Sequence, residues 1–184
     1  MELKVLSTNI AEPITVADQK AFMGYTSSDQ DAVIFRMIQT ARTWLENRTA
    51  LSLVNKQYKA YFEREDAVNG WYELPVSPVQ TTPAIAVKVC GTSTTFEQMG
   101  LDRIRIRPDT VIGTTKIGAT GQAYYVETTF NAGASNDAAN EILKRVVSSM
   151  FNAREDGGGA EVLTGRIPFD TMRLIEAIDQ TTGF

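Results

Sequence analysis

Three arginines alternate along one predicted strand. Arg103, Arg105 and Arg107 stand at every second position of "LDRIRIR", so their side chains share one face of that strand. A row of guanidinium groups could contact the phosphates of a DNA passing through a channel, or dock against an acidic partner surface. A solvated strand face balanced by Asp102 and Asp109 is the simpler interpretation.

A second candidate site is the group of acids around Arg64 in "FEREDA". Glu63 and Glu65 are the nearest approach to a catalytic carboxylate pair, as a small hydrolase acting on cell-wall glycan would need. Nothing in the pattern places these acids in an apolar pocket that would separate their pKa values. A solvated loop is therefore the favoured reading of this segment.

The composition excludes most other catalytic sites. The chain has no histidine and a single cysteine, Cys90, so histidine-based triads, the usual zinc sites and an internal disulfide are all excluded. The glycines of "GTTKIGATGQ" do not have the GxxxxGK[ST] spacing of a phosphate-binding loop. We expect no catalytic residue, no metal site, no cofactor and no enzymatic activity.

Charge and hydropathy limit the class of protein. The 184 residues include 18 Lys and Arg against 22 Asp and Glu, a net charge of −4 that argues against a dedicated nucleic-acid binder. No apolar run approaches the length of a membrane span, and "MELKVLSTNI" does not read as a signal peptide. We expect a globular protein of a reducing cytoplasm, with no membrane partner.

Apolar residues at helical spacing predict three helices, over residues 15–24, 28–49 and 136–156. Thr15 with Asp18, and Ser28 with Asp31, have the spacing of capping boxes at the first two helix starts. Gly24 is suited to end the first helix. We expect the apolar stripes of these helices to face a core.

Between the helices the period changes to two, which predicts strands within residues 52–131. The alternating runs are "KQYKAYFE", "AIAVKVC", "LDRIRIR" and "AYYVETTF", separated by glycines. The expected fold class is α+β: a helical bundle, made of the N-terminal helix pair and the C-terminal helix, with a small antiparallel sheet inserted and a C-terminal arm.

The stretch "GWYELPVSPVQ" carries two prolines. Pro75 and Pro78 remove two backbone donors and bias Leu74 and Ser77 toward extended conformations. The segment should therefore leave its sheet at an edge. We expect Trp71 and Leu74 to anchor its near end in the core.

The last part of the chain reads as an arm. The run "GGG" at 157–159 cannot continue a helix and predicts a hinge, which divides the chain into a domain of residues 1–156 and an arm of 157–184. An amphipathic arm beyond a hinge suits a partner, whereas a last helix folded back on the domain is the alternative. The candidate contact residues are Ile167, Pro168, Phe169, Met172, Leu174, Ile175, Ile178 and Phe184.

The order of these elements resembles the head–tail connector family of tailed bacteriophages, also called adaptor or head-completion proteins. Three segments carry the resemblance: the helix pair ending "WLENRT", the proline segment "YELPVSPVQ", and "TTFNAGASNDAANEILKRVVSSMFNARED". The arm stretch "GRIPFDTMRLIEAI" is similar to the close of the family. The resemblance implies that residues 1–156 are the connector domain.

The resemblance also implies a structural role in a virion. Such proteins form a ring, usually of twelve copies, beneath the portal in the neck between head and tail. The expected partners are the portal protein, gripped by the arm, neighbouring copies, a stopper or tail-completion protein, and the double-stranded DNA that passes through the channel. Assembly would take place in the host cytoplasm, from a subunit that is monomeric on its own. The alternatives are another neck protein, such as a tail terminator, and the carboxylate-dependent hydrolase.

Overall fold

The computed structural model describes residues 1–8, 11–101, 103–109, 124–134, 137–155, 171–173 and 175–176. Internal contacts divide the chain into two units. The β unit is formed by Met1–Asn9 and Val54–Ala134. The helical unit is formed by Ile10–Leu53 and Ser135–Phe184. Each unit has its own hydrophobic cluster.

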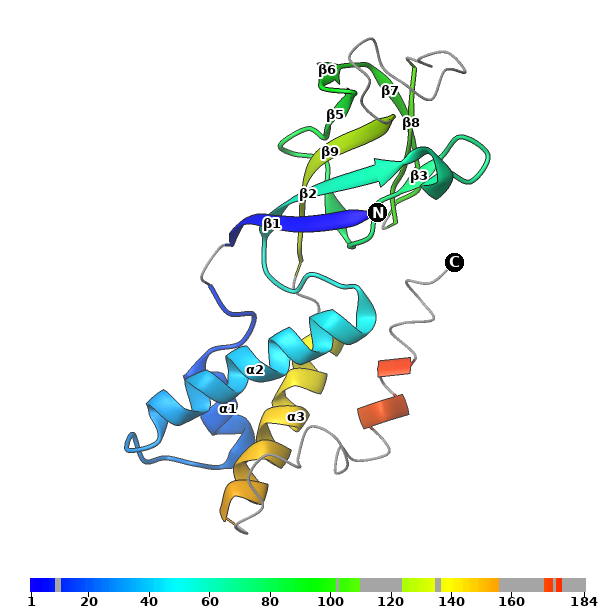
Figure 1. Ribbon diagram of the computed structural model, residues 1–184. Coiled ribbons are helices and arrows are strands. Elements are labelled where there is room, and N and C mark those ends of the chain that lie inside the picture. The colour runs from blue at the N-terminus through cyan, green and yellow to red at the C-terminus, as the bar shows by residue number, and fades with distance from the viewer. Residues whose placement is uncertain are drawn as a thin grey trace. The chain divides into compact units, whose positions relative to one another are not determined.

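The larger sheet of the β unit has six strands, all paired antiparallel. They are β1 (Glu2–Thr8), β2 (Lys56–Glu63), β4 (Val79–Gln80), β5 (Ala86–Val89), β6 (Thr92–Ser93) and β9 (Tyr125–Ala132). The order is β1-β2-β9-β5-β6, and β4 pairs with the end of β9 (Figure 1). Strand β9 is therefore central, and β1 is an edge strand.

A second, three-stranded sheet belongs to the same unit. Its order is β3-β8-β7, and its strands are β3 (Tyr72–Glu73), β8 (Arg105–Pro108) and β7 (Phe96–Met99). Both sheets contribute to one core, in which Phe62 of β2 meets Tyr72 of β3 with ring centroids 5.4 Å apart. On β9, Val126, Thr128 and Phe130 are buried, which confirms the predicted alternation.

The proline segment connects the two sheets. The segment begins in β3 and ends in β4, which pairs with β9. Between them, the backbone N–H of Leu74 donates to the Ile104 carbonyl. Leu74 is buried as predicted. Trp71 is only half-buried, so the prediction that it anchors the segment in the core is wrong.

Gly133 follows β9 at a point of close approach between backbones. Its φ is +136°, and a Cβ at this position would overlap the carbonyl group of Val54. Its N–H donates to the Pro78 carbonyl at 3.0 Å, and its own carbonyl accepts from the Gln80 side chain at 2.7 Å. Only glycine fits a site with this conformation and so little space.

The helical unit contains α1 (Val16–Met23), α2 (Asp31–Thr49) and α3 (Asp137–Glu155). The capping box of Thr15 and Asp18 is present, and Gly24 ends α1 in the left-handed conformation, as predicted. The second predicted capping box is wrong. Helix α2 begins after Gln30 without a side-chain cap, and Asp31 instead pairs with Lys20 at 2.8 Å.

The apolar stripes of α2 and α3 face each other in the core of this unit, as their periodicity predicts. The fully buried members are Ile34, Ile38, Ala41 and Leu45 on α2, and Ala139, Ile142, Leu143, Val146 and Val147 on α3. Gln19 of α1 is also fully buried, and its amide donates to the Lys144 carbonyl and the Ser148 hydroxyl, each at 3.1 Å. These bonds connect α1 to α3.

The predicted fold class is wrong in one essential respect. The chain is not a helical bundle with a small inserted sheet, because the strands form two sheets around a core of their own. The prediction also placed every strand between the helices and omitted β1, which precedes α1 and pairs with β2 along its length. The β structure is a unit comparable in size to the helical one.

Candidate assembly surfaces

The three arginines lie on one side of the smaller sheet. Arg105 and Arg107 are exposed on β8 and Arg103 precedes them, while Ile104 and Ile106 point into the core. This confirms the predicted sharing of one strand face.

The neighbours of the arginines come from β3 and β7. Glu73 lies opposite Arg105 on one side, and Met99 lies opposite Arg105 on the other. Glu73 accepts from Arg103 at 3.4 Å and from Arg105 at 3.3 Å.

The third arginine is held in a different way. Arg107 forms an ion pair with Glu97, its cross-strand neighbour on β7, and lies over the Trp71 ring, 4.9 Å from its centroid. We call the surface made by these side chains the arginine face: Trp71, Glu73, Glu97, Met99, Arg103, Arg105 and Arg107.

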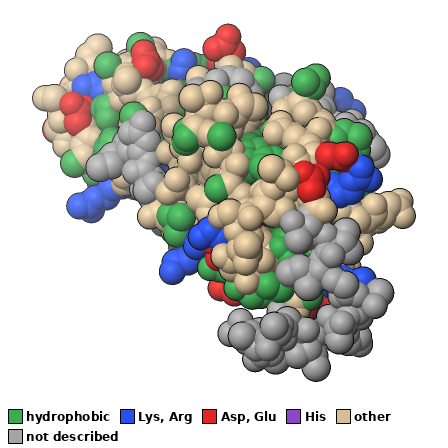
Figure 2. Space-filling view, turned by 90° about the horizontal axis from the view of Figure 1, so that it is seen from above, with side chains coloured by type: hydrophobic (Ala, Val, Ile, Leu, Met, Phe, Trp, Pro, Cys, Tyr) green, Lys and Arg blue, Asp and Glu red, His purple; other side chains and the backbone are tan. Residues whose placement is uncertain are grey.

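Two carboxylates that the sequence pattern does not indicate balance part of the charge of this face. Among the described residues, the carboxylates that pair with the arginines are Glu73 and Glu97, and Asp109 is not one of them. Asp102 lies outside the described residues. The five charged side chains have a net charge of +1, which gives only weak electrostatic attraction for a phosphate. On the side of the molecule seen in Figure 2, acidic and basic side chains are scattered among apolar ones, without a large patch of one sign.

The acidic turn does not have the geometry of a catalytic pair. Glu63 and Glu65 are exposed around the short 3₁₀ helix Arg64–Asp66. The backbone N–H of Glu63 donates to Asp66 at 2.7 Å and lowers the pKa of that carboxyl. A glycosidase needs one carboxyl kept protonated by an apolar pocket. This turn provides an ionised carboxylate in water instead.

Part of the predicted arm lies in the core of the helical unit. Ile175 is 2% exposed within its hydrophobic cluster, Met172 packs against that cluster, and Thr171 is buried. The other predicted arm residues lie outside the described residues, as does the predicted hinge: Ile167, Pro168, Phe169, Leu174, Ile178 and Phe184.

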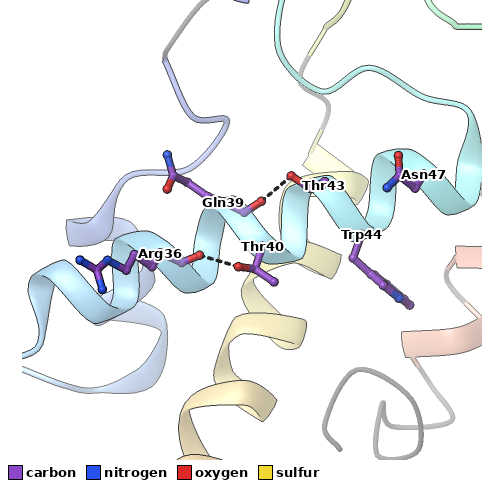
Figure 3. A pocket seen from close by; sticks show the side chains of 6 residues that line it. All are labelled: Arg36, Gln39, Thr40, Thr43, Trp44 and Asn47. Carbon is purple, nitrogen blue, oxygen red and sulfur yellow. Dashed lines mark hydrogen bonds between the residues drawn. The ribbon is translucent and has the colours of Figure 1, made fainter. Parts of the chain in front are cut away.

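An open groove of about 610 Å³ runs along α2, and no motif in the sequence predicts it. The described residues that line it all belong to α2: Arg36, Gln39, Thr40, Thr43, Trp44 and Asn47 (Figure 3). The Thr40 and Thr43 hydroxyls donate to carbonyls one turn earlier, at 2.9 Å each.

In the described residues, no group of three or more carboxylate or thiol side chains could hold a metal ion. The described helices are also too short or too polar to cross a membrane.

Comparison with known proteins gives the fold its context. No protein-family model matches the chain, and no curated protein matches it. Among solved structures, a chain in the virion of a native gene transfer agent (GTA) particle superposes with a TM-score of 0.69 at 21% identity, covering 96% of this chain and 94% of that one. Chains in two neck structures match similarly. The neck of an empty GTA particle, computed with C6 symmetry, gives 0.68 at 22% identity over 97% and 95% of the two chains. The neck of a native GTA particle, computed with C12 symmetry, gives 0.66 at 21% identity over 97% and 94%.

The chain has the fold of these neck chains. The match extends over both units, so neither the β unit nor the helical unit is an addition to that fold. At this level of identity the likeness establishes architecture, and the roles of individual residues rest on the surfaces described above.

Three of the seven residues of the arginine face, the arginines, follow from the sequence alone. Trp71 and Glu73 alternate in "WYE", and Glu97 and Met99 alternate in "FEQM", so each pair could have been placed on one strand face. Their meeting with the arginines depends on the pairing β3-β8-β7, which no local pattern specifies.

Proposed function

We propose that this chain is a structural, non-enzymatic protein of a virion neck. The observation that carries the proposal is the fold shared along 96–97% of the chain with chains of gene transfer agent particles, two of them in necks. The exposed position of Glu63 and Glu65 supports a non-catalytic role, because neither is protected from water.

Within the neck, the proposed role is that of the head–tail connector. Copies of the chain form a ring beneath the portal, extend the DNA channel and offer a platform to a stopper or tail protein. The C6 and C12 symmetry of the matching neck structures supports a cyclic arrangement of copies. The net charge of −4 supports passage of DNA without retention, since like charge opposes phosphate binding.

Removal of the chain from the particle tests this role. Without a connector, heads should assemble and fill with DNA but should not join tails, and negative-stain electron microscopy would show separate heads and tails. Re-expression of the intact chain should restore complete particles. Complete, infectious or DNA-transferring particles formed without the chain would contradict the proposal.

Co-purification separates the connector from the other neck candidate, a tail terminator. Affinity-tagged chain should retain the portal protein from disrupted particles. Retention of the tail tube protein without the portal would instead identify a tail terminator.

The arm can be tested by truncation, with one precaution. A chain ending at Gly157 should lose portal binding if the arm grips the portal. Because Ile175 is buried in the helical unit, this truncation also removes a core side chain. A second chain ending at Glu176 keeps Ile175 and removes only Ile178, Phe184 and their neighbours. Stable packaging with both truncated chains bound at the portal would contradict a gripping arm.

The hydrolase alternative has a direct test. The intact chain should leave purified peptidoglycan undigested. Digestion that is lost on Glu63→Gln or Glu65→Gln substitution would overturn the non-enzymatic assignment.

A further inference from the structure

We propose that the arginine face is the surface by which one copy of this chain contacts the next copy in the neck ring. The inference rests on the proposed function, because it assumes that copies of the chain are adjacent in a ring. It adds the surface and the chemistry of the contact.

Five of the seven side chains of the face, Trp71, Met99 and the three arginines, are of types enriched in protein interfaces. Tryptophan, arginine and methionine are the residue types enriched there, and lysine is depleted. All three cations of the face are arginines. Met99 is 47% exposed beside Arg105, and Leu101, two residues further along the chain, is 92% exposed. These side chains offer apolar area to a partner next to the charged groups.

The face is already ordered in the single chain. Cross-strand ion pairs hold Arg105 against Glu73 and Arg107 against Glu97, and the Trp71 ring supports the Arg107 guanidinium. Ordering a long side chain on association costs conformational entropy. Arginines that are held before the partner arrives avoid part of that cost.

The carboxylates of the face do not satisfy its arginines. Three guanidinium groups carry about fifteen N–H donors, whereas two carboxylates offer about eight acceptor positions. Glu73 is shared by Arg103 and Arg105 at 3.4 and 3.3 Å, which is longer than the roughly 2.7–2.9 Å of a strong charge-assisted bond. Counting the described carboxylates of the face, outward donors therefore remain for acceptors supplied by a partner.

Charge complementarity favours a second copy as that partner. The face sums to +1 and the whole chain to −4, so the remainder of every copy carries −5. The face is complementary in sign to acidic surface on another copy, and complementary charges fix the orientation of a contact. A net charge of +1 does not by itself retain DNA, whose binding needs many cationic contacts.

Site-specific photo-crosslinking in assembled particles tests the proposal. The photoreactive residue p-benzoylphenylalanine replaces Met99, and a second variant carries it at Leu101 in case the first does not enter particles. After irradiation, we expect a product with the mass of two copies of this chain. A product with another neck protein or with DNA, or no product from chains present in the particle, would overturn the inference while the chain remained a neck protein. Absence of both variants and of the native chain from particles would refute the proposed function itself.

A charge reversal gives a matched comparison. Arg105→Glu places a third carboxylate in the face and should lower the yield of the two-copy product by at least about tenfold, equivalent to about 1.4 kcal/mol. Arg105→Lys should lower it less. Arg48→Glu makes the same charge change at an exposed site on α2 and should leave the yield unchanged. Equal yields from Arg105→Glu and Arg48→Glu would count against the proposed contact.

Discussion

The ion pair of Lys59 and Glu127 links the two central strands, β2 and β9, across the outer surface of the larger sheet, with N and O 2.9 Å apart. Burial raises the pKa of Glu127, but the hydrogen bond and charge of Lys59, with smaller contributions from Tyr61 and Lys88, outweigh burial and lower that pKa below its ordinary 4.5. A carboxyl whose pKa is lowered in the folded state stabilises the fold at pH values above its ordinary pKa. The contribution is lost as the pH falls through the lowered value.

The pair therefore predicts part of the acid sensitivity of the chain. Between about pH 5 and pH 3, the free energy of unfolding of the native chain should fall more steeply than that of Glu127→Gln, measured by urea denaturation. The control Glu65→Gln keeps the ion pair and should keep the steeper fall. Identical curves for the native chain and Glu127→Gln would contradict this assignment.

Thr128 has a buried hydroxyl that lacks a hydrogen-bond partner among the described residues. It lies on β9 between Ala60 and Val87, its cross-strand neighbours. A buried hydroxyl without a partner loses its hydration and gains no bond in return.

Replacing this hydroxyl by a methyl group should stabilise the protein. We expect Thr128→Val to raise the free energy of unfolding by about 1 kcal/mol, measured by chemical denaturation. Thr129→Val, on the outer face of the same strand, should change it by less than about 0.5 kcal/mol. A destabilised Thr128→Val variant would show that the hydroxyl is bonded in the folded protein.

At the scale of elements, Gly133 fixes how the chain leaves β9. Gly133→Ala forces a Cβ onto the Val54 carbonyl at a positive φ, and we expect a loss of roughly 3 kcal/mol or more in the free energy of unfolding. Gly91 lies in the β5–β6 turn, where an added Cβ would meet only the Tyr125 hydroxyl, at an ordinary 3.5 Å. Gly91→Ala should therefore lower the free energy of unfolding by only about 1 kcal/mol, because of its φ of +83°. Equal costs at the two positions would contradict the close approach.

The elements that the sequence predicted are those with local signals. The helices follow from apolar residues at helical spacing, and the start of α1 follows from Thr15 and Asp18. Strand β1 has only a short signal, because Leu3 and Val5 alternate with Glu2 and Lys4 but the register with β2 shifts between Val5 and Ser7. Strands β4 and β6 are two residues long and have no period to detect.

The arginine face shows the same limit for a site. One strand is enough to place Arg103, Arg105 and Arg107 on one side. Their acceptors are distant in sequence: Glu73 is 32 residues from Arg105 in the chain, and Glu97 is 10 residues from Arg107. Only the pairing of β3 and β7 with β8 brings them together.

At the scale of the whole molecule, the two units each bury a core and each leave apolar side chains exposed. In the β unit these include Leu3, Val5 and Met99, and in the helical unit Phe22 and Phe35. A ring needs two different contact surfaces on every copy, because each copy meets its neighbours head to tail. We propose the arginine face as one of these two surfaces.

Electron cryomicroscopy of particles from the strain that carries this gene tests the central claim most directly. The neck should be reconstructed both with C12 symmetry and with none imposed. We predict a ring of copies of this chain between head and tail, adjacent to the portal. A complete neck that lacks the chain, or a particle that carries it elsewhere, would contradict its assignment as a neck protein.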